Sequence, residues 1–150
     1  MDAATSIVTG LAALATAVAG GVYVGFSAMV MPALGDTPPA EAASVMNRIN
    51  VRAPRSSFLL FFLASPVLAV VAAVLTLGRL PEADAVLALV GAVLAVAAFL
   101  ITGAVNVPLN NRLARDGDYA AFAQRWRRAN GLRGLVSLAG GAALIGALAV

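Results

Sequence analysis

The sequence predicts an all-α fold, an integral membrane four-helix bundle with two short interfacial helices on its cytoplasmic side. The first observation is composition, because 61% of the 150 residues are hydrophobic and 11% are charged, against about 25% charged in soluble domains. The second is four apolar runs, at about 7–34, 58–77, 85–105 and 132–150. Roughly 20 helical residues cross a 30 Å hydrocarbon core. Residues 1–150 are therefore expected to form a single transmembrane domain.

The missing residue types exclude several kinds of chemistry. The chain has no cysteine and no histidine, which excludes disulfides, thiolate nucleophiles, Cys/His zinc sites and His- or Cys-ligated haem. We therefore expect no metal and no cofactor. The net charge of +3 comes from arginines, since the chain has no lysine. In a membrane protein such charges set the topology, so we expect no nucleic-acid partner.

The first run, residues 7–34, has small residues at every fourth position and a proline near its end. Small residues at this spacing allow a neighbouring helix to approach closely, although an alanine-rich composition also produces the pattern by chance. Pro32 is expected to break the helix or to fix its exit angle. The residues of the small ladder are Ala13, Ala17, Gly21 and Gly25.

The polar segment 35–55 is predicted to contain the first interfacial helix. The prolines of the TPP sequence at 37–39 are typical of a helix start. From Ala40 onward the apolar residues follow the spacing of an amphipathic helix that lies against the membrane or the bundle. Those residues are Ala42, Val45, Met46 and Ile49.

The second and third spans are joined by a tight turn. Span 58–77 begins with an aromatic cluster and carries Pro66 in its interior, where a proline bends a membrane helix without ending it. The GRLPEAD sequence at 78–84 is short. The third span, 85–105, must therefore return antiparallel beside the second.

The segment 107–130 is predicted to contain the second interfacial helix. Tyr119, Phe122 and Trp126 recur at helical spacing, with arginines on the opposite side. We expect this helix to end before the fourth span, which begins at about Leu132.

Arginine counting predicts the topology. The polar segments 35–55 and 107–133 contain nine arginines, whereas the turn between the second and third spans contains only Arg79. Cytoplasmic loops carry an excess of positive charge. We therefore expect a multi-pass protein of the cell membrane with both long loops in the cytoplasm and both termini outside.

All nine aromatic residues lie in or beside the predicted cytoplasmic half. An interfacial belt favours Trp and Tyr at both interfaces, whereas this set is one-sided and rich in Phe. Two interpretations stay open, namely the mouth of a pocket for a flat apolar aromatic ligand, and ordinary packing. The residues expected to contact such a ligand are Tyr23, Phe26, Phe58, Phe62, Phe99 and Trp126.

Polar residues gather at the same depth. Asn106 lies at the edge of the hydrocarbon, where an unsatisfied amide is costly, and Arg133 enters the fourth helix at a similar level. In a structural role, these side chains would cap the carbonyl groups that are left free around Pro32 and Pro108. In a functional role, they would donate hydrogen bonds to an oxygen of a ligand. We take Asn106 and Arg133 as the catalytic candidates.

Four sequence motifs, in this order on four hydrophobic helices, resemble the anthrone-oxygenase-like family of small membrane proteins. They are YVGFSAMVMPAL (23–34), MNRIN (46–50), NVPLNNRLA (106–114) and WRRANGLRG (126–134). Fungal relatives are associated with oxidising anthrones to anthraquinones, so the resemblance implies an oxidoreductase. The residues that it places around the site are Met31, Pro32, Asn50, Asn106, Pro108, Asn110, Trp126, Asn130 and Arg133.

The implied chemistry fits this residue set except for the base. An anthrone has an acidic methylene whose carbanion reacts directly with dioxygen, so the protein would supply a base, an oxyanion stabiliser and a dry aromatic slot. Arg133 and the asparagines suit the second role. The candidate bases are a water molecule or one of the loop acids Asp36, Glu41, Asp116 and Asp118.

The competing hypothesis is non-enzymatic. A small membrane bundle with small-residue faces can also bind a lipid, a quinone or a partner subunit, and such faces are typical of homo-oligomers. A cavity enclosed by the Phe and Asn residues would favour the enzyme. A fully packed cytoplasmic half would favour the alternative.

Overall fold

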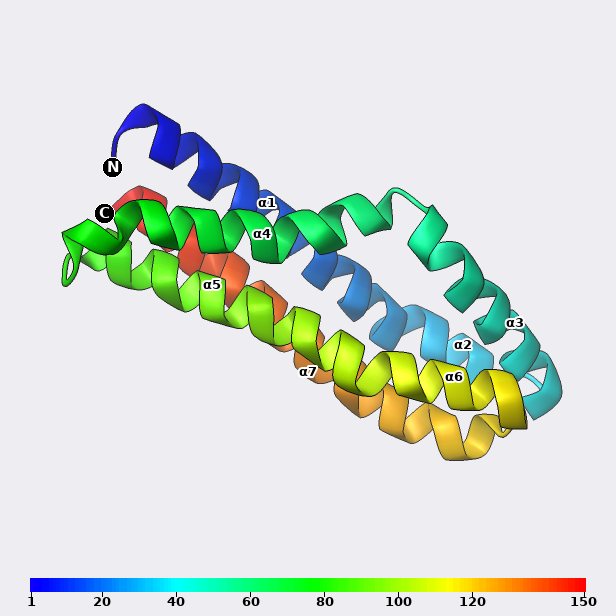
Figure 1. Ribbon diagram of the computed structural model, residues 1–150. Helices are drawn as coiled ribbons and strands as arrows, with labels where there is room; N and C mark the ends of the chain where they lie inside the picture. Colours follow the sequence, from blue (N-terminus) through cyan, green and yellow to red (C-terminus); the bar gives the residue numbers. More distant parts are fainter.

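The computed structural model describes all 150 residues and confirms the all-α four-helix bundle (Figure 1). Four helices are long and apolar enough to cross a membrane, namely Ala3–Gly35, Phe58–Arg79, Ala83–Asp116 and Tyr119–Ala149. The elements are α1 (Ala3–Gly25), η1 (Phe26–Val30), α2 (Met31–Gly35), α3 (Pro39–Arg52), η2 (Ala53–Arg55), α4 (Phe58–Thr76), η3 (Leu77–Arg79), α5 (Ala83–Ile101), η4 (Thr102–Asn106), α6 (Val107–Asp116) and α7 (Tyr119–Ala149).

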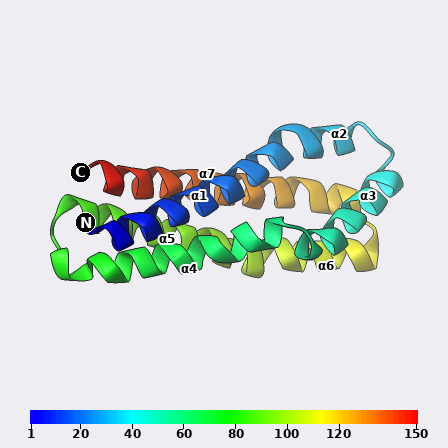
Figure 2. The ribbon, with the colours of Figure 1, turned by 90° about the horizontal axis from the view of Figure 1, so that it is seen from above.

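The bundle has two unlike ends. Both chain termini and the α4–α5 turn lie at one end, which we call the terminal end, and α2, α3, α6 and the first turns of α7 lie at the other, the polar end (Figures 1 and 2). The helix Ala3–Gly35 has 33 residues, which makes it about 50 Å long at 1.5 Å per residue. A 30 Å hydrocarbon core covers only part of that length. This helix is therefore longer than the apolar layer is thick.

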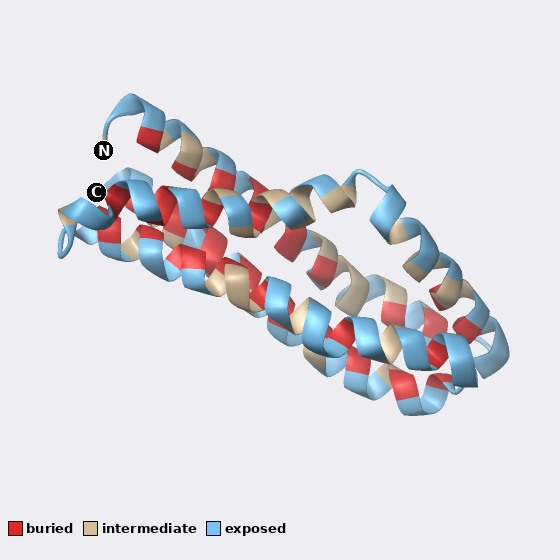
Figure 3. Cartoon of the chain, in the orientation of Figure 1, coloured by how far each residue is buried: buried red, intermediate tan, exposed pale blue.

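Buried residues occur along the whole length of the bundle (Figure 3), but the two ends of the core differ in residue type. Toward the terminal end it consists of alanines around Leu144, with Ala12, Ala69 and Ala92 from three different helices. Small residues of this kind let helices pack closely in lipid, where no hydrophobic drive exists. At the polar end the core is built from large side chains, as in a water-soluble domain. Its members are Met31, Leu34, Ala42, Ala43, Met46, Leu113, Tyr119, Phe122 and Trp126.

Paired glycines on α7 bring it close to two neighbours. A Cβ on Gly140 would lie 3.1 Å from Leu94 Cβ of α5, and one on Gly141 would lie 3.4 Å from the backbone nitrogen of Ala17 on α1. Gly91 of α5 faces the same contact, because its Cβ would lie 2.6 Å from Leu144 Cγ. Of the predicted small ladder, Ala17 lies at this contact, whereas Gly21 faces open space.

Two π-helical turns interrupt the long helices at equivalent places. In η1 the Met31 N–H donates to the Phe26 carbonyl, and in η4 the Val107 N–H donates to the Thr102 carbonyl. Each turn ends two residues before a proline, Pro32 or Pro108. A proline ring clashes with the carbonyl four residues earlier, and the wider turn relieves that clash. Pro32 therefore neither breaks the helix nor ends it.

The second interfacial helix is not a separate element, so the predicted boundary at residue 132 is wrong. Helix α7 runs without a break through Asn130 and Gly131 (Figure 2). An asparagine favours a helix end when its side chain bonds its own backbone. Here the Asn130 amide bonds to α1 and η1 instead, so the helix continues.

The first interfacial helix, α3, packs against the bundle. It buries Ala42, Ala43 and Met46 in the core of the polar end. Beside it, α6 ends at Asp116 and is capped by Gly117, whose φ of 67° suits glycine, and α7 begins at Tyr119. The short connection places the start of α7 against both α6 and α3.

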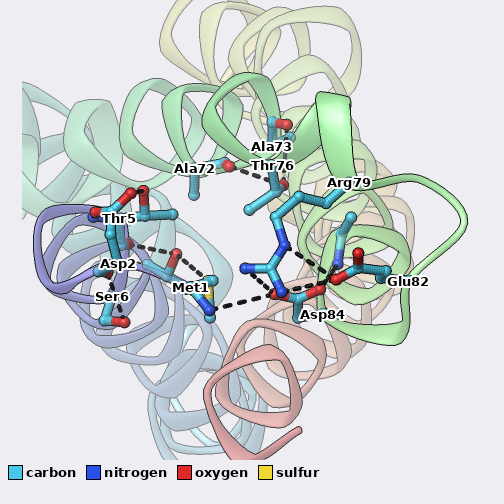
Figure 4. A network of polar contacts seen from close by, with 12 residues as sticks. Met1, Asp2, Thr5, Ser6, Ala72, Ala73, Thr76, Arg79, Glu82 and Asp84 are labelled. Atoms are coloured by element: carbon cyan, nitrogen blue, oxygen red, sulfur yellow. Dashed lines mark hydrogen bonds and ion pairs between the residues drawn. The ribbon is translucent and has the colours of Figure 1, made fainter.

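An ion-pair network closes the terminal end (Figure 4). Arg79 Nη2 lies 2.8 Å from Glu82 Oε2, and its Nη1 lies 2.9 Å from Asp84 Oδ2. Asp84 is buried, and the amino group of Met1 lies 3.8 Å from the same carboxylate oxygen. The pattern of the turn had indicated only an antiparallel return. The network adds a charged contact that holds the α4–α5 turn against the start of α1.

Candidate functional site

Two residues of α7 connect the π-turns η1 and η4. The Asn130 side-chain amide donates to the Tyr23 carbonyl at 2.7 Å and to Ser27 Oγ of η1 at 2.6 Å. Arg133 Nη1 donates to Thr102 Oγ1 of η4 at 3.2 Å. The two α7 residues also bond to each other, because Arg133 Nε and Nη2 both donate to Asn130 Oδ1, at 2.9 and 2.7 Å. π-Turns recur at functional sites, and here both meet one polar pair.

Arg133 is a buried cation without a carboxylate partner. Its side chain is 8% exposed, and every ion pair of the protein lies at the terminal end instead. Its guanidinium carbon lies 4.1 Å from the centre of the Tyr23 ring and 5.4 Å from that of Trp126. Ring faces stabilise a cation only in part. Of the five guanidinium N–H groups, three donate within the protein, which leaves two for a ligand.

Asn106 is the most fully buried amide with no partner. Its residue is 1% exposed, and neither its Oδ1 nor its Nδ2 has a hydrogen-bond partner. The residues one turn before and one turn after Asn106 both bond to α7. Thr102 Oγ1 accepts from Arg133, and Asn110 Oδ1 accepts from Trp126 Nε1 at 2.9 Å. Asn106 lies between them on the same side of the helix. It therefore occupies the level of Asn130 and Arg133.

The aromatic rings form two series that meet at Arg133. The first runs from Tyr23 through Phe58 and Phe62 to Phe99, with the Phe62 and Phe99 rings stacked at 5.0 Å. Along it the exposed fraction falls from 37% at Phe99 to 3% at Tyr23. The series thus leads from the outer surface of α4 and α5 to the guanidinium.

The second series lies in the core of the polar end. Phe26 and Phe122 each lie 6.0 Å from the Trp126 ring, and Tyr119 follows at 6.0 Å from Phe122. Phe122, Trp126 and Tyr119 are buried. These rings pack as a core rather than as the wall of an opening.

The remaining predicted residues divide between packing and unpaired groups. Met31 is buried in the core of the polar end, and Asn110 is used by Trp126. Asn50 Nδ2 on α3 is buried without a partner, as is Asn47 Oδ1 one turn before it. The polar end therefore contains several unpaired amide groups, of which those of Asn106 are the most deeply buried.

Two hollows open on the surface at the polar end, and neither is lined by Asn106 or Arg133. One, of about 670 Å³, lies along α3 at Asn47, Arg48 and Arg52. The other, of about 640 Å³, lies between η1 and α7. Asn106 and Arg133 therefore lie in the packed interior between the helices, and neither hollow is the cavity enclosed by Phe and Asn residues that would favour the enzyme.

Ser27 and Thr102 are functional candidates that sequence reasoning missed. Both hydroxyls lie in π-turns and accept hydrogen bonds from the α7 pair. The only signal in the sequence was that Ser27 precedes Pro32 by five residues and Thr102 precedes Pro108 by six.

The loop acids that were considered as bases lie away from this site. Asp36, Glu41 and Asp116 are all exposed. The fourth, Asp118, accepts from the Ala121 N–H at the start of α7, so no acid faces Arg133.

The comparison with protein families gives one match. Residues 55–143, more than half of the chain, match the family model described as anthrone oxygenase. No curated protein and no solved structure matches the chain. The matched segment contains Asn106, Asn130 and Arg133, whereas Tyr23 and Ser27 precede it.

Proposed function

Because the chain belongs to the anthrone oxygenase family, we propose that it oxidises an anthrone- or hydroquinone-like aromatic compound at the polar end. The observation that carries the proposal is a buried arginine without a carboxylate at the level of a buried amide without a partner, Arg133 and Asn106. An ionisable residue inside a membrane span is a functional candidate by default. An unpaired buried amide such as that of Asn106 is costly, and a bound ligand that pairs with it would explain why it is retained.

Arg133 stabilises the negative charge that develops on the substrate oxygen. Removal of a methylene proton from an anthrone converts its ketone into an enolate, and a cation held in a dry environment favours that anion. The guanidinium is held in place by Asn130 and Thr102 before the substrate arrives. Asn130 is a positioning residue in this scheme, since its amide and its oxygen are both used within the protein.

Asn106 binds a second polar group of the ligand. Its amide offers both a donor and an acceptor and has no competing partner. The rings of Phe58, Phe62 and Phe99 provide an apolar path for the ligand. They lead from the lipid-facing surface of α4 and α5 to Tyr23, whose ring contacts Arg133. A flat apolar molecule dissolved in the bilayer would enter between these helices.

The overall reaction balances without a further reductant. The anthrone methylene loses one proton to water, the carbanion forms a C–O bond with dioxygen, and protonation gives a hydroperoxide. Loss of water from the hydroperoxide leaves a new ketone, so the methylene and O2 yield a carbonyl group and H2O. Dioxygen is reduced and the carbon is oxidised. The exposed loop acids are not needed as the base, because stabilisation of the enolate by Arg133 makes the carbon acid stronger.

Replacing Asn106 by leucine is expected to separate activity from stability. The Asn106→Leu variant loses the ligand-facing amide, and we expect O2 consumption with an anthrone to fall by at least about tenfold. The same change removes an unpaired buried amide, which costs about 1–3 kcal/mol, so the melting temperature in detergent should rise. Both readouts are measured on purified protein, with the uncatalysed oxidation subtracted.

Asn111→Leu is the matched control, because Asn111 is exposed one residue after Asn110. It should change neither readout. Mass spectrometry of co-purifying small molecules adds a third readout. A wild-type protein that carries a bound aromatic compound, lost in Asn106→Leu, but consumes no O2 would support the non-enzymatic binding role. An active Asn106→Leu variant would contradict the proposed site.

We also propose that the polar end faces the cytoplasm. The absence of native cysteines makes single substitutions clean reporters. Gly78, with open space around it at the terminal end, and Ser44, exposed on α3, are suitable positions. In spheroplasts, a membrane-impermeant maleimide should label Gly78→Cys and should label Ser44→Cys only after permeabilisation. The reverse pattern would invert the orientation.

A further inference from the structure

The hollow between η1 and α7 has the composition of an anion site. Arg127 and Arg128 line it together with Gln124, Ser27 and Gly131, and no acidic residue is part of its lining. Both arginines are exposed, and neither takes part in an ion pair of the protein. Two free cations and two neutral donors around one hollow match the needs of a phosphate group.

Ser27 joins this hollow to the interior. Its Oγ accepts from the Asn130 amide at 2.6 Å, and a hydroxyl that accepts one bond can still donate its own proton. Gly131 contributes open space, because a Cβ at this position would meet nothing within 4 Å. The hollow is therefore lined by uncharged groups at Ser27 and Gly131 and by the donors of Arg127 and Arg128.

The depth of the hollow agrees with that of lipid headgroups. Counting about 20 residues along α1 from its start at Ala3, or back along α7 from its end at Ala149, reaches the level of Ser27 and Arg128 to within about a helical turn. Both neighbouring helices are lipid-facing up to this level, with Val24 43% and Leu132 50% exposed. A phosphate held there would have its acyl chains along α1 and α7.

We propose that this hollow is a binding site for the headgroup phosphate of an anionic membrane phospholipid. Basic pockets between membrane helices at the headgroup level bind such lipids. The lipid would cover the outer side of the Ser27–Asn130 hydrogen bond, and the site is independent of the proposed oxidation.

Native mass spectrometry of the detergent-solubilised full chain tests the site. Wild-type protein titrated with phosphatidylglycerol should retain one lipid molecule, whereas phosphatidylcholine should bind more weakly. The double variant Arg127→Gln/Arg128→Gln should weaken phosphatidylglycerol binding by about 10- to 30-fold. The matched control Arg112→Gln/Arg115→Gln removes the same charge from exposed positions on α6 outside the hollow and should retain it.

A second variant tests the shape of the hollow without a change of charge. Gly131→Phe fills the open space beside Ser27, and it should also lose the lipid while the melting temperature stays near that of the wild type. Equal losses in both double variants, or equal binding of the two lipids, would overturn the proposal. Retention by Gly131→Phe would do the same. Displacement of the lipid by millimolar inorganic phosphate would assign the hollow to free phosphate instead.

Discussion

Replacing Arg133 by methionine is expected to lower the rate of O2-dependent oxidation by about 100- to 1,000-fold, the usual effect of removing a donor that stabilises an oxyanion. The change removes the only buried cation of the polar end, which lies between the rings of Tyr23 and Trp126. Methionine fills a similar volume without charge. The rate is measured as O2 consumption by purified protein with an anthrone as substrate.

The stability of the Arg133→Met variant should fall only slightly. Asn130 Oδ1 loses both of its donors, which costs about 1–3 kcal/mol. Removing a buried charge that has no carboxylate partner offsets part of this loss. Arg133→Lys should recover only part of the activity, because an ammonium cannot bond Asn130 and the substrate in a fork. A fully active Arg133→Met variant would refute the proposed role, and Arg115→Met on the exposed side of α6 serves as the control.

Replacing Gly91 by leucine is expected to prevent the close contact of α5 with α7. Even a Cβ at this position would lie 2.6 Å from Leu144 Cγ and 3.1 Å from the Gly140 carbonyl oxygen. Overpacking by a few methyl groups costs about 1–3 kcal/mol or more. Since folded proteins are stable by only about 5–15 kcal/mol, we expect little monodisperse protein on size exclusion in detergent and a sharply lower melting temperature.

Gly21→Leu is the matched control for this change. A Cβ on Gly21 of α1 would meet nothing within 4 Å, and leucine favours a helix by up to about 1 kcal/mol over glycine. This variant should be at least as stable as the wild type. The smaller change Gly91→Ala, made together with Leu144→Ala, should recover part of the stability lost by Gly91→Ala alone, because the two residues contact each other. Independent effects of the two substitutions would contradict the packing described.

The sequence predicted the four apolar helices because lipid imposes a length and a composition that any span must satisfy. It also predicted that α3 is an amphipathic helix, from the spacing of Ala42 and Met46, which are buried. The boundary within α7 was not predictable in the same way. Asn130 is typical of a helix end by local rules, and its bonds to Tyr23 and Ser27 span more than 100 positions of the chain.

The candidate site, too, was predictable from the sequence only in part. Asn106 and Arg133 stood out in the sequence because polar residues at that depth need a reason, and they do lie at one level of the bundle. The roles of Thr102 and Ser27 depend on which helices are neighbours, and no periodicity within one segment carries that information. The aromatic residues were one group in the sequence and are two in the structure, because Tyr23 and Phe26 point to different helices.

The π-turns have a further consequence for how the two halves of each helix are oriented. One additional residue in a turn rotates everything beyond it by about 100° relative to an uninterrupted α-helix. The residues of α2 therefore point about 100° away from where an uninterrupted α-helix would direct them, and in this orientation Met31 and Leu34 reach the core of the polar end. The same holds for α5 and Leu113 of α6. Two proline-linked phase shifts thus let two continuous helices serve lipid packing in one half and a water-excluding core in the other.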